Sequence, residues 1–302
     1  MREPRHIEPL PLGGEEIPYS KGLMARSLIA TGMSAVRAYE LARRLDSDLT
    51  ETGTTEVDLE RMHELAVEVL GEDEGARAMR RLLRYRELQL LELPIILLLG
   101  GATGTGKSTI ATEIAYRLGI SRVTSTDFVR QTMRAFFSRE FMPSVHYSSF
   151  EAGQAVSGIG GEQVLTGFLD QTRNVLVGVG AAIDRALEEG WSMVLEGVHL
   201  VPGMLPASLE RAVLVQCVLS IEDAESHSQH FWVRDVASDG VRRLDKYLEG
   251  FDDIRAIQEF IVSRARESSV AVIENDNIES AVADVMELVF AEVERVQGDG
   301  PD

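Results

Sequence analysis

The chain has few features that would place it in a membrane or in an oxidising compartment. Among its 302 residues there is one cysteine, Cys217, so no disulfide can form within the chain. No apolar run reaches the roughly 18 residues that a membrane-spanning helix needs. The first residues also lack the apolar core of a secretory signal. We therefore expect a cytoplasmic protein that does not enter a membrane.

Positive charge is scarce as well. Lys and Arg number 30 against 49 Asp and Glu, which gives a net charge of −19 at pH 7. More than half of this excess falls within residues 248–302, where it is typical of solvated helix surface. Proteins that bind nucleic acid generally depend on a basic surface. The composition therefore predicts that nucleic acid is not a partner.

Glycine, by contrast, is concentrated in one motif. Residues 101–108 read Gly-Ala-Thr-Gly-Thr-Gly-Lys-Ser, a complete G-x-x-x-x-G-K-S/T phosphate loop. An apolar run over residues 95–99 precedes the loop, and residues 109–118 follow it with helical spacing. The glycines let successive N–H groups face a polyphosphate, and the helix that follows adds its positive end. The motif predicts that the chain binds a nucleoside triphosphate.

The loop also predicts individual contacts to the nucleotide. Lys107 is expected to reach the β- and γ-phosphates, and the Ser108 hydroxyl to ligate Mg²⁺. The whole set of expected ligand contacts is Gly101, Thr103, Gly104, Thr105, Gly106, Lys107, Ser108 and Thr109.

Strand and helix patterns alternate from residue 95 onward, which predicts an α/β fold. The candidate strands cover residues 95–99, 122–125, 193–195, 212–219 and 270–273. Apolar runs separated by helices are typical of a parallel sheet covered on both faces. We therefore expect a P-loop NTPase fold with a five-stranded parallel sheet and helices on both faces.

The first third of the chain is instead helical in pattern. Helices are expected over residues 21–45 with a break at 32–34, over 57–70 and over 74–92, with a loop at 46–53. Prolines and glycines make residues 1–18 an irregular lead-in. The expected domains are therefore the lead-in, a small all-helical domain over 19–92, a P-loop domain over 94–297 and a tail over 298–302.

Acidic residues follow two of the candidate strands. Ligands bind at the carboxyl edge of a parallel sheet, where Asp127 and Glu196 are expected. Glu196 ends an apolar strand and is expected to hold Mg²⁺ or its water. Asp127 accepts the proton of an attacking hydroxyl, holds Mg²⁺ through water, or caps the helix that follows, and its position alone leaves these interpretations open.

Basic and hydroxyl side chains near the same edge are candidates for binding an anionic substrate. Arg130 and Arg134 lie one helical turn apart, and paired guanidinium groups suit carboxylate or phosphate. The stretch with His146, Ser148 and Ser149, and His199 after the third strand, supply further polar groups, although a histidine is more often structural.

The helical stretch after the fourth strand is typical of the lid of a P-loop kinase, whose arginines close over the transferring phosphoryl group. Its basic residues are His227, His230, Arg234, Arg242, Arg243 and Lys246. A salt-bridged surface helix is the alternative, because aspartates are interspersed. No further ligand is spaced to complete a zinc site with the two histidines.

In this order, the motifs resemble those of the 2-phosphoglycerate kinase family. The resemblance spans about residues 17–290 and rests on residues 98–109, 125–134, 146–149 and 196–199, with a more divergent match at 225–234. It implies ATP-dependent phosphorylation of the 3-hydroxyl of 2-phosphoglycerate to give 2,3-bisphosphoglycerate, with ATP and Mg²⁺ as cofactors. The expected catalytic residues are then Lys107, Asp127 and Arg234, with Arg130, Arg134, His146, Ser148, Ser149 and His199 at the acceptor.

The helices before residue 93 are similar to the ATP-cone module. The similarity rests on residues 19–22, 38–42 and 84–86. ATP cones open with a basic, glycine-containing strand pair, whereas residues 1–18 offer Arg2, Arg5 and His6 among prolines. Nucleotide binding by this domain and a structural role therefore both stay open.

Two other functions compete with this interpretation. One is a kinase for another phosphorylated or carboxylated polyol, because family resemblance transfers chemistry better than substrate. The other is a regulatory protein in which ATP moves the N-terminal helices against a partner. Turnover separates them, since an enzyme consumes ATP only with its acceptor present. No pattern in the sequence predicts an oligomeric state.

Overall fold

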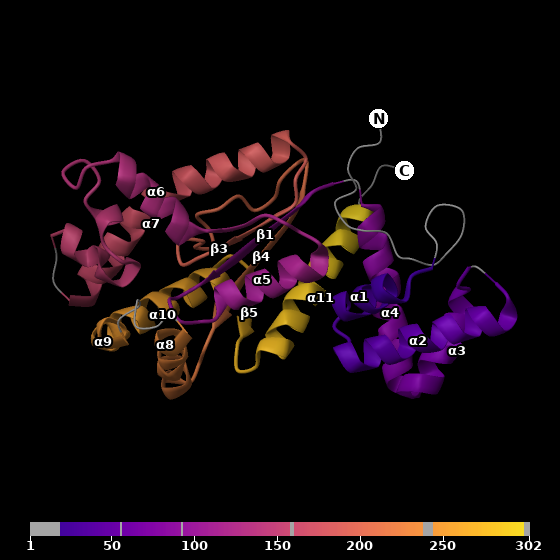
Figure 1. The fold of residues 1–302 in the computed structure, drawn as a ribbon. Coiled ribbons are helices and arrows are strands. Elements are labelled where there is room, and N and C mark those ends of the chain that lie inside the picture. The colour runs from indigo at the N-terminus through magenta and orange to yellow at the C-terminus, as the bar shows by residue number, and fades with distance from the viewer. Residues whose placement is uncertain (1–18, 55, 92, 158–159, 238–243, 299–302) are drawn as a thin grey trace. The chain divides into compact units, whose positions relative to one another are not determined.

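The computed structural model describes residues 19–54, 56–91, 93–157, 160–237 and 244–298 (Figure 1). The predicted lead-in, most of the predicted tail, Arg242 and Arg243 lie outside these ranges. The chain divides into two compact units: Met1–Glu92 with Tyr116–Ile120 and Val293–Asp302, and Leu93–Ala115 with Ser121–Glu292. Among the described helices, none combines the length and the apolar character that a membrane crossing requires.

Four helices make up most of the first unit. They are α1 (Lys21–Ala30), α2 (Ala35–Thr52), α3 (Leu59–Leu70) and α4 (Glu72–Leu90). The side chains of Ser20, Ser34 and Asp58 each accept a hydrogen bond from the N–H three residues on, which explains where the first three helices begin. Their buried faces form a core from Met24, Leu28, Leu41, Leu45, Met62, Leu65 and Leu82.

The predicted loop at residues 46–53 is wrong, because α2 continues to Thr52. The polar side chains that suggested a loop are satisfied inside the helix. The hydroxyls of Ser47, Thr50 and Thr52 each donate to the carbonyl four residues earlier. Asp48 is buried and accepts from the Arg61 guanidinium at 2.7 Å. The helix ends only at Gly53, whose φ of 70° terminates it.

A five-stranded parallel sheet forms the centre of the second unit and confirms the predicted fold class. The strands are β1 (Ile95–Gly101), β2 (Val123–Ser125), β3 (Met193–Glu196), β4 (Val213–Ser220) and β5 (Ala271–Glu274). Their order is β2-β3-β1-β4-β5, and every pairing is parallel. All carboxyl ends therefore meet at one edge, where ligands bind in such sheets.

Helices follow every strand of the sheet except β3, from which the chain runs to β4 through residues 197–212 without a helix, a departure from the predicted alternation. The helices are α5 (Lys107–Leu118), α6 (Thr126–Phe136), α7 (Gly160–Glu188), α8 (Ala224–Ala237), α9 (Leu244–Glu249), α10 (Phe251–Glu267) and α11 (Ile278–Gly298). Two short 3₁₀ helices, η1 (Ser144–His146) and η2 (Ser149–Ala155), lie between α6 and α7.

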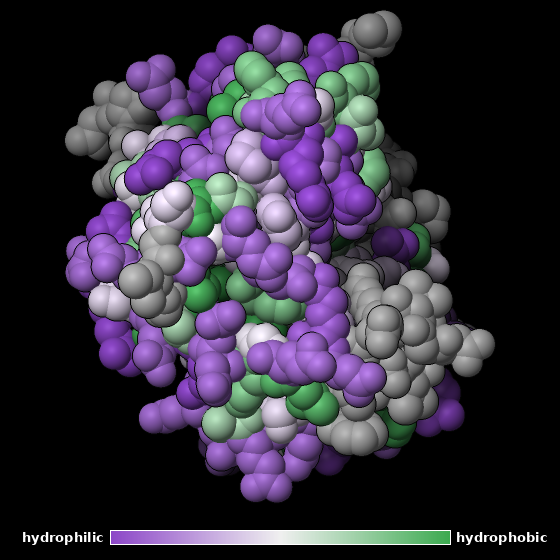
Figure 2. All heavy atoms as spheres, turned by 90° about the vertical axis from the view of Figure 1, so that its left-hand side faces the viewer, coloured by the Kyte–Doolittle hydropathy of each residue, from purple (hydrophilic) through white to green (hydrophobic). Residues whose placement is uncertain are grey.

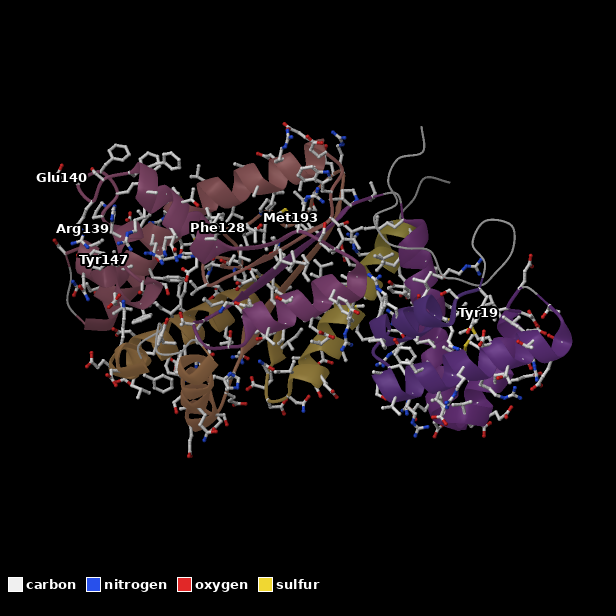
Figure 3. All side chains as sticks on the ribbon, viewed as in Figure 1. Tyr19, Phe128, Arg139, Glu140, Tyr147 and Met193 are labelled. Atoms are coloured by element: carbon white, nitrogen blue, oxygen red, sulfur yellow. The ribbon has the colours of Figure 1, made fainter. Side chains whose placement is uncertain are left out.

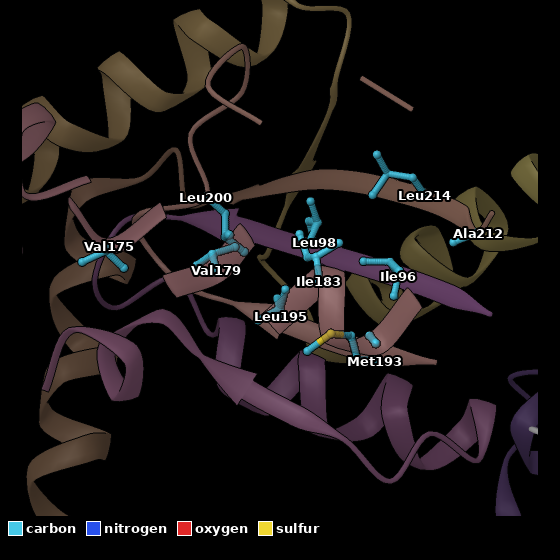
Figure 4. Close-up of a cluster of buried hydrophobic side chains, with 11 residues drawn as sticks. Ile96, Leu98, Val175, Val179, Ile183, Met193, Leu195, Leu200, Ala212 and Leu214 are labelled. Atoms are coloured by element: carbon cyan, nitrogen blue, oxygen red, sulfur yellow. The ribbon is translucent and has the colours of Figure 1, made fainter. Parts of the chain in front are cut away.

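Both faces of the sheet are covered. Every residue of β1 is buried, although successive side chains of a strand point to opposite faces. On one face Ile96 and Leu98 pack against Val175, Val179 and Ile183 of α7 (Figure 4). At the end of the molecule near α6 and α9, hydrophobic side chains occur in small groups among hydrophilic ones (Figure 2).

Cys217 lies in the interior of this sheet. It belongs to β4, paired with Leu99 of β1 on one side and Ala271 of β5 on the other. The side chain is buried, and burial raises the pKa of the thiol to about 12. The thiol therefore acts as a packing group in the native state.

Candidate active site

The phosphate loop connects β1 to α5 and has a backbone that only glycine tolerates. Gly104 has a φ of 92° and Gly106 a φ of 84°, both in the left-handed region. A Cβ on Gly104 would lie 2.6 Å from the Phe231 ring, and one on Gly106 would overlap the amide of Asn275. The loop is therefore packed from outside by the segments that follow β4 and β5.

Lys107 begins α5 and folds back over the loop. It is buried, and its Nζ donates to the Ala102 carbonyl at 2.6 Å. A phosphate oxygen is a stronger acceptor for an ammonium group than a neutral carbonyl. The lysine is therefore placed to exchange this bond for one to a phosphate in the loop.

Ser108 and Glu196, both expected to hold Mg²⁺, meet beside the loop. The Ser108 hydroxyl donates to Glu196 Oε1 at 2.9 Å, and Glu196 is buried at the end of β3, next to Leu99 of β1. Hydroxyl and carboxylate oxygens are ligands that Mg²⁺ accepts, with phosphate oxygens and water completing its shell. Within the described ranges no group of three His, Cys, Asp or Glu could hold a metal by itself.

A cavity of about 430 Å³ opens next to this pair. Its walls come from the ends of β2 and β3 and from the first turns of α5 and α6. The lining residues are Ser108, Thr112, Val123, Thr124, Ser125, Phe128 and Glu196. A ligand at the carboxyl edge of β2 therefore has room beside the Ser108–Glu196 pair.

Asp127 lies in the first turn of α6 at the same edge. The helix is capped by Ser125, whose Oγ accepts from the Phe128 N–H at 3.0 Å, so capping does not require Asp127. The Asp127 carboxylate instead accepts from Arg130 Nε at 3.1 Å. Partial desolvation opposes its charge although the side chain is largely exposed, but Arg130, and beyond it Lys107, lower its pKa below the usual value. The group is therefore an anion at neutral pH.

The two arginines of α6 differ in their surroundings. Arg130 is buried, and its Nη1 donates to the carbonyls of Val145 at 3.0 Å and Tyr147 at 2.8 Å. Arg134, one turn later, is exposed. Arg130 thus connects α6 to the segment around η1, whereas Arg134 faces solvent.

The segment over residues 144–151 is itself held by side chains. His146 Nε2 pairs with the Phe137 carbonyl at 3.0 Å. The Ser148 hydroxyl accepts from Lys246 at 3.0 Å, while Ser149 is buried. The Arg139 guanidinium lies 5.0 Å from the centre of the Tyr147 ring (Figure 3). The structure therefore brings His146 to the carboxyl end of α6 and the Ser148 hydroxyl to Lys246 of α9.

His199 is fully buried beneath this segment, so its ring contacts protein rather than solvent. Gln171 donates from Nε2 to the Ser144 and Tyr147 carbonyls, at 2.5 and 3.1 Å, so its Oε1 accepts from His199 Nε2 at 2.9 Å. Nδ1 of the ring is then the acceptor for the Thr126 hydroxyl at 2.8 Å. Burial lowers the pKa of His199 to about 3, so the ring is neutral.

Some predicted residues of the lid lie beyond what the structure describes. The backbone of Arg234 belongs to α8, but its side chain is outside the described part, as are Arg242 and Arg243 altogether. His227 and His230 are described, and both contact the phosphate loop. His227 Nε2 lies 2.8 Å from the Thr103 carbonyl and His230 Nδ1 3.0 Å from the Gly104 carbonyl.

Two residues of the site were missed at the level of the sequence. Asn275 donates from Nδ2 to the Thr105 carbonyl at 3.0 Å, and Gln171 forms the hydrogen bonds described above. Asn275 directly follows the fifth strand, so the rule that selected Asp127 and Glu196 would have found it. Gln171 lies inside a long helix and carried only a weak signal, a polar residue on a buried face.

Comparisons with known proteins agree with this geometry. No protein-family model matches the chain. It is 36% identical over 277 residues to the 2-phosphoglycerate kinase of Pyrococcus furiosus, covering 91% of this chain and 90% of that protein. It is 38% identical over 283 residues to the 2-phosphoglycerate kinase of Methanococcus vannielii, covering 91% and 89%. The 2-phosphoglycerate kinase of Methanopyrus kandleri is 34% identical over 280 residues, covering 92% and 85%.

Proposed function

Because this chain belongs to the 2-phosphoglycerate kinase family, we propose that it transfers the γ-phosphoryl group of ATP to the hydroxyl of 2-phosphoglycerate. The product is 2,3-bisphosphoglycerate. The observation that carries the proposal is the meeting of Lys107, Ser108 and Glu196 at the sheet edge from which Asp127 also projects. Phosphoryl transfer needs charge stabilisation and positioning of this kind.

On the nucleotide side, the loop N–H groups and Lys107 bind the phosphates of ATP. Lys107 neutralises charge that builds on the γ-phosphoryl oxygens as the bond to ADP breaks. Ser108 and Glu196 are the residues that would hold Mg²⁺, which would supply positive charge to offset that of the phosphates. The hydrogen bond between the two side chains places both oxygens where one ion can take them together.

On the acceptor side, Asp127 orients the attacking hydroxyl. Its carboxylate accepts the hydroxyl hydrogen bond and takes the proton while the oxygen forms its bond to phosphorus. The bond between the γ-phosphorus and the bridging oxygen breaks, and ADP leaves with the electron pair. The lowered pKa of Asp127 keeps it ionised, and therefore able to accept, at neutral pH.

The acceptor carries a phosphate and a carboxylate, and we propose arginines and hydroxyls as its ligands. Arg134 is exposed on the same helix as Asp127, and Arg234 follows on α8. His146, Ser148 and Ser149 supply donors from the segment around η1. Arg130 and His199 are buried and support this segment instead. Arg130 donates directly to the Tyr147 carbonyl, whereas His199 acts through Gln171, which donates to the same carbonyl.

The proposal is tested by ADP release against a panel of acceptors. The panel contains 2-phosphoglycerate, 3-phosphoglycerate, glycerate, shikimate and gluconate, with a no-acceptor control and phosphorus NMR to identify the product. Rapid ADP formation with 2-phosphoglycerate and a new phosphate ester are expected. Faster turnover on another acid would assign a different acceptor. Slow hydrolysis independent of every acid would instead support a nucleotide-gated regulatory protein.

A further inference from the structure

The outside of the phosphate loop is held by side chains from two other segments. Three successive carbonyls, those of Thr103, Gly104 and Thr105, accept hydrogen bonds from His227, His230 and Asn275 at 2.8, 3.0 and 3.0 Å. His227 and His230 lie on α8, and Asn275 follows β5. A carbonyl can only accept, so each of these side-chain nitrogens carries the donated hydrogen.

The planarity of the peptide gives these bonds a consequence inside the loop. In a trans peptide the C=O and the next N–H point in opposite directions. Holding three carbonyls outward therefore turns the N–H groups of Gly104, Thr105 and Gly106 toward the inside of the loop. The Thr105 N–H reaches the Ala102 carbonyl at 3.4 Å, which is also the acceptor of Lys107. These are the groups that would meet phosphate oxygens.

The His227 ring is fixed in the orientation that this role requires. It stacks on Phe231 with ring centres 5.7 Å apart and contacts the edge of Phe251 at 5.5 Å. Arg255 Nη1 lies 3.5 Å from Nδ1, the nitrogen without a hydrogen. Arg255 is itself held by the carbonyls of Ile221 and Glu222 at 2.6 and 2.9 Å. Burial keeps the pKa of His227 at about 4, so the neutral ring keeps a single donor, on Nε2.

We propose that His227 and His230 are positioning residues for ATP, which orient the phosphate loop through its carbonyls, with Asn275 as the third support. The proposal rests on the kinase function only in taking ATP as the ligand. It explains why His227 is buried and His230 half-buried on a helix that also carries charged residues, where the sequence left open a lid or a salt-bridged surface. Losing a donor leaves a buried carbonyl unpaired and frees its peptide to turn.

Paired substitutions separate this role from simple packing. His227→Phe keeps a ring against Phe231 and Phe251 but has no donor, whereas His227→Gln returns an N–H near the position of Nε2. His230→Leu and His230→Asn form the matching pair for Nδ1. Ser228→Ala is the control on the same helix, because the Ser228 hydroxyl bonds to Glu225 of its own helix at 2.8 Å.

The readouts are the Kd for ATP by calorimetry without acceptor, and the KM values for ATP and for 2-phosphoglycerate. His227→Phe and His230→Leu are expected to raise the Kd and the KM for ATP at least about tenfold, or about 1.4 kcal/mol. The KM for the acceptor should stay close to the original. His227→Gln, His230→Asn and Ser228→Ala should bind ATP nearly as the unaltered protein does.

The calorimetric arm is independent of the acceptor, so it stands even if transfer to 2-phosphoglycerate fails. Wild-type ATP affinity in folded His227→Phe and His230→Leu variants would overturn the proposal. Equal losses in His227→Phe and His227→Gln would do the same, because packing and not the donor would then matter. If His227→Phe does not fold, Asn275→Leu carries the test, since it removes the donor to Thr105 and should weaken ATP binding by a similar factor.

Discussion

At the scale of single residues, Asp127 gives the sharpest test of the transfer step. Asp127→Asn keeps the size of the side chain and a hydrogen-bonding oxygen but can hardly take a proton. We expect kcat to fall by roughly 10²–10⁴, the usual contribution of general acid–base catalysis, with little change in the KM for ATP. Steady-state kinetics and thermal melting are measured together. A variant that melts earlier but turns over normally would leave Asp127 a structural partner of Arg130.

His199 makes a prediction about stability and pH. Its folded pKa is about 3, against the ordinary histidine value of 6.5, because burial outweighs the attraction of Asp127 while Arg130 and Lys107 repel the charged ring. Below pH 6.5 His199 therefore binds a proton in the unfolded chain but not in the folded chain, so the free energy of unfolding falls as the pH is lowered. This group alone contributes up to about 1.4 kcal/mol per pH unit.

Replacing the ring removes that contribution. The difference in unfolding free energy between the wild type and His199→Gln should shrink as pH is lowered from 7 to 5. Urea unfolding is followed by tryptophan fluorescence, since Trp191 and Trp232 both lie in the unit that contains His199. His63→Gln, at an exposed position of α3, is the control. A difference that stays constant over this range would contradict the neutral buried ring.

At the scale of elements, α6 carries one arginine that supports the protein structure and one that we propose binds the acceptor. Arg130 is turned into the protein and holds the carbonyls of Val145 and Tyr147, whereas Arg134 is exposed. Arg134→Ala should therefore raise the KM for the acceptor at least about tenfold, or about 1.4 kcal/mol, without changing the KM for ATP. Arg185→Ala, at the far end of α7 and paired with Glu188 at 3.7 Å, is the matched surface control. An unchanged acceptor KM would place the anion clamp elsewhere.

Elements were easier to predict than their side-chain partners. The five strands were predicted to within two residues at each end. For β1 and β4 the signal was a continuous apolar run, which is typical of buried parallel strands. The last turns of α2 were missed because Ser47, Thr50 and Thr52 find acceptors in their own helix, which composition does not reveal. Composition also could not reveal that His227 and Asn275, 48 positions apart, hold the carbonyls of Thr103 and Thr105 in the same loop, since that depends on the tertiary fold.

The candidate site shows the same division. Residues attached to a short motif, such as Lys107 and Ser108, were predicted because the chemistry fixes their spacing. Ser108 and Glu196, both expected to hold Mg²⁺, are brought within hydrogen-bonding distance. His199 was expected at the acceptor because it follows the third strand, but that position could not show that the ring would be buried. The roles of Arg134 and Arg234 stay predictions.

At the scale of the whole molecule, the net charge of −19 opposes the approach of an anionic acid. Local attraction from arginines must then supply acceptor binding. At an ionic strength of 0.15 M, screening acts over about 8 Å and so weakens the distant repulsion more than close contacts. Moderate salt should therefore leave turnover at low acceptor concentration unchanged or slightly faster. Initial rates across a salt series at fixed ATP test this, and a steep loss of rate would show that long-range attraction guides the acceptor.

The rate at which a thiol reagent labels the buried Cys217 reports how often the sheet opens. Cys217 pairs with Leu99 of β1, the strand that leads into the phosphate loop, and its side chain is buried. A thiol reagent therefore reaches it only when that part of the sheet opens. Such opening also dismantles the ATP site, and nucleotide should therefore slow the labelling reaction. With ATP at about 100 times its Kd, and closing faster than labelling, the rate should fall about a hundredfold. Because the chain has one cysteine, its labelling rate would measure the opening of the sheet without an engineered label.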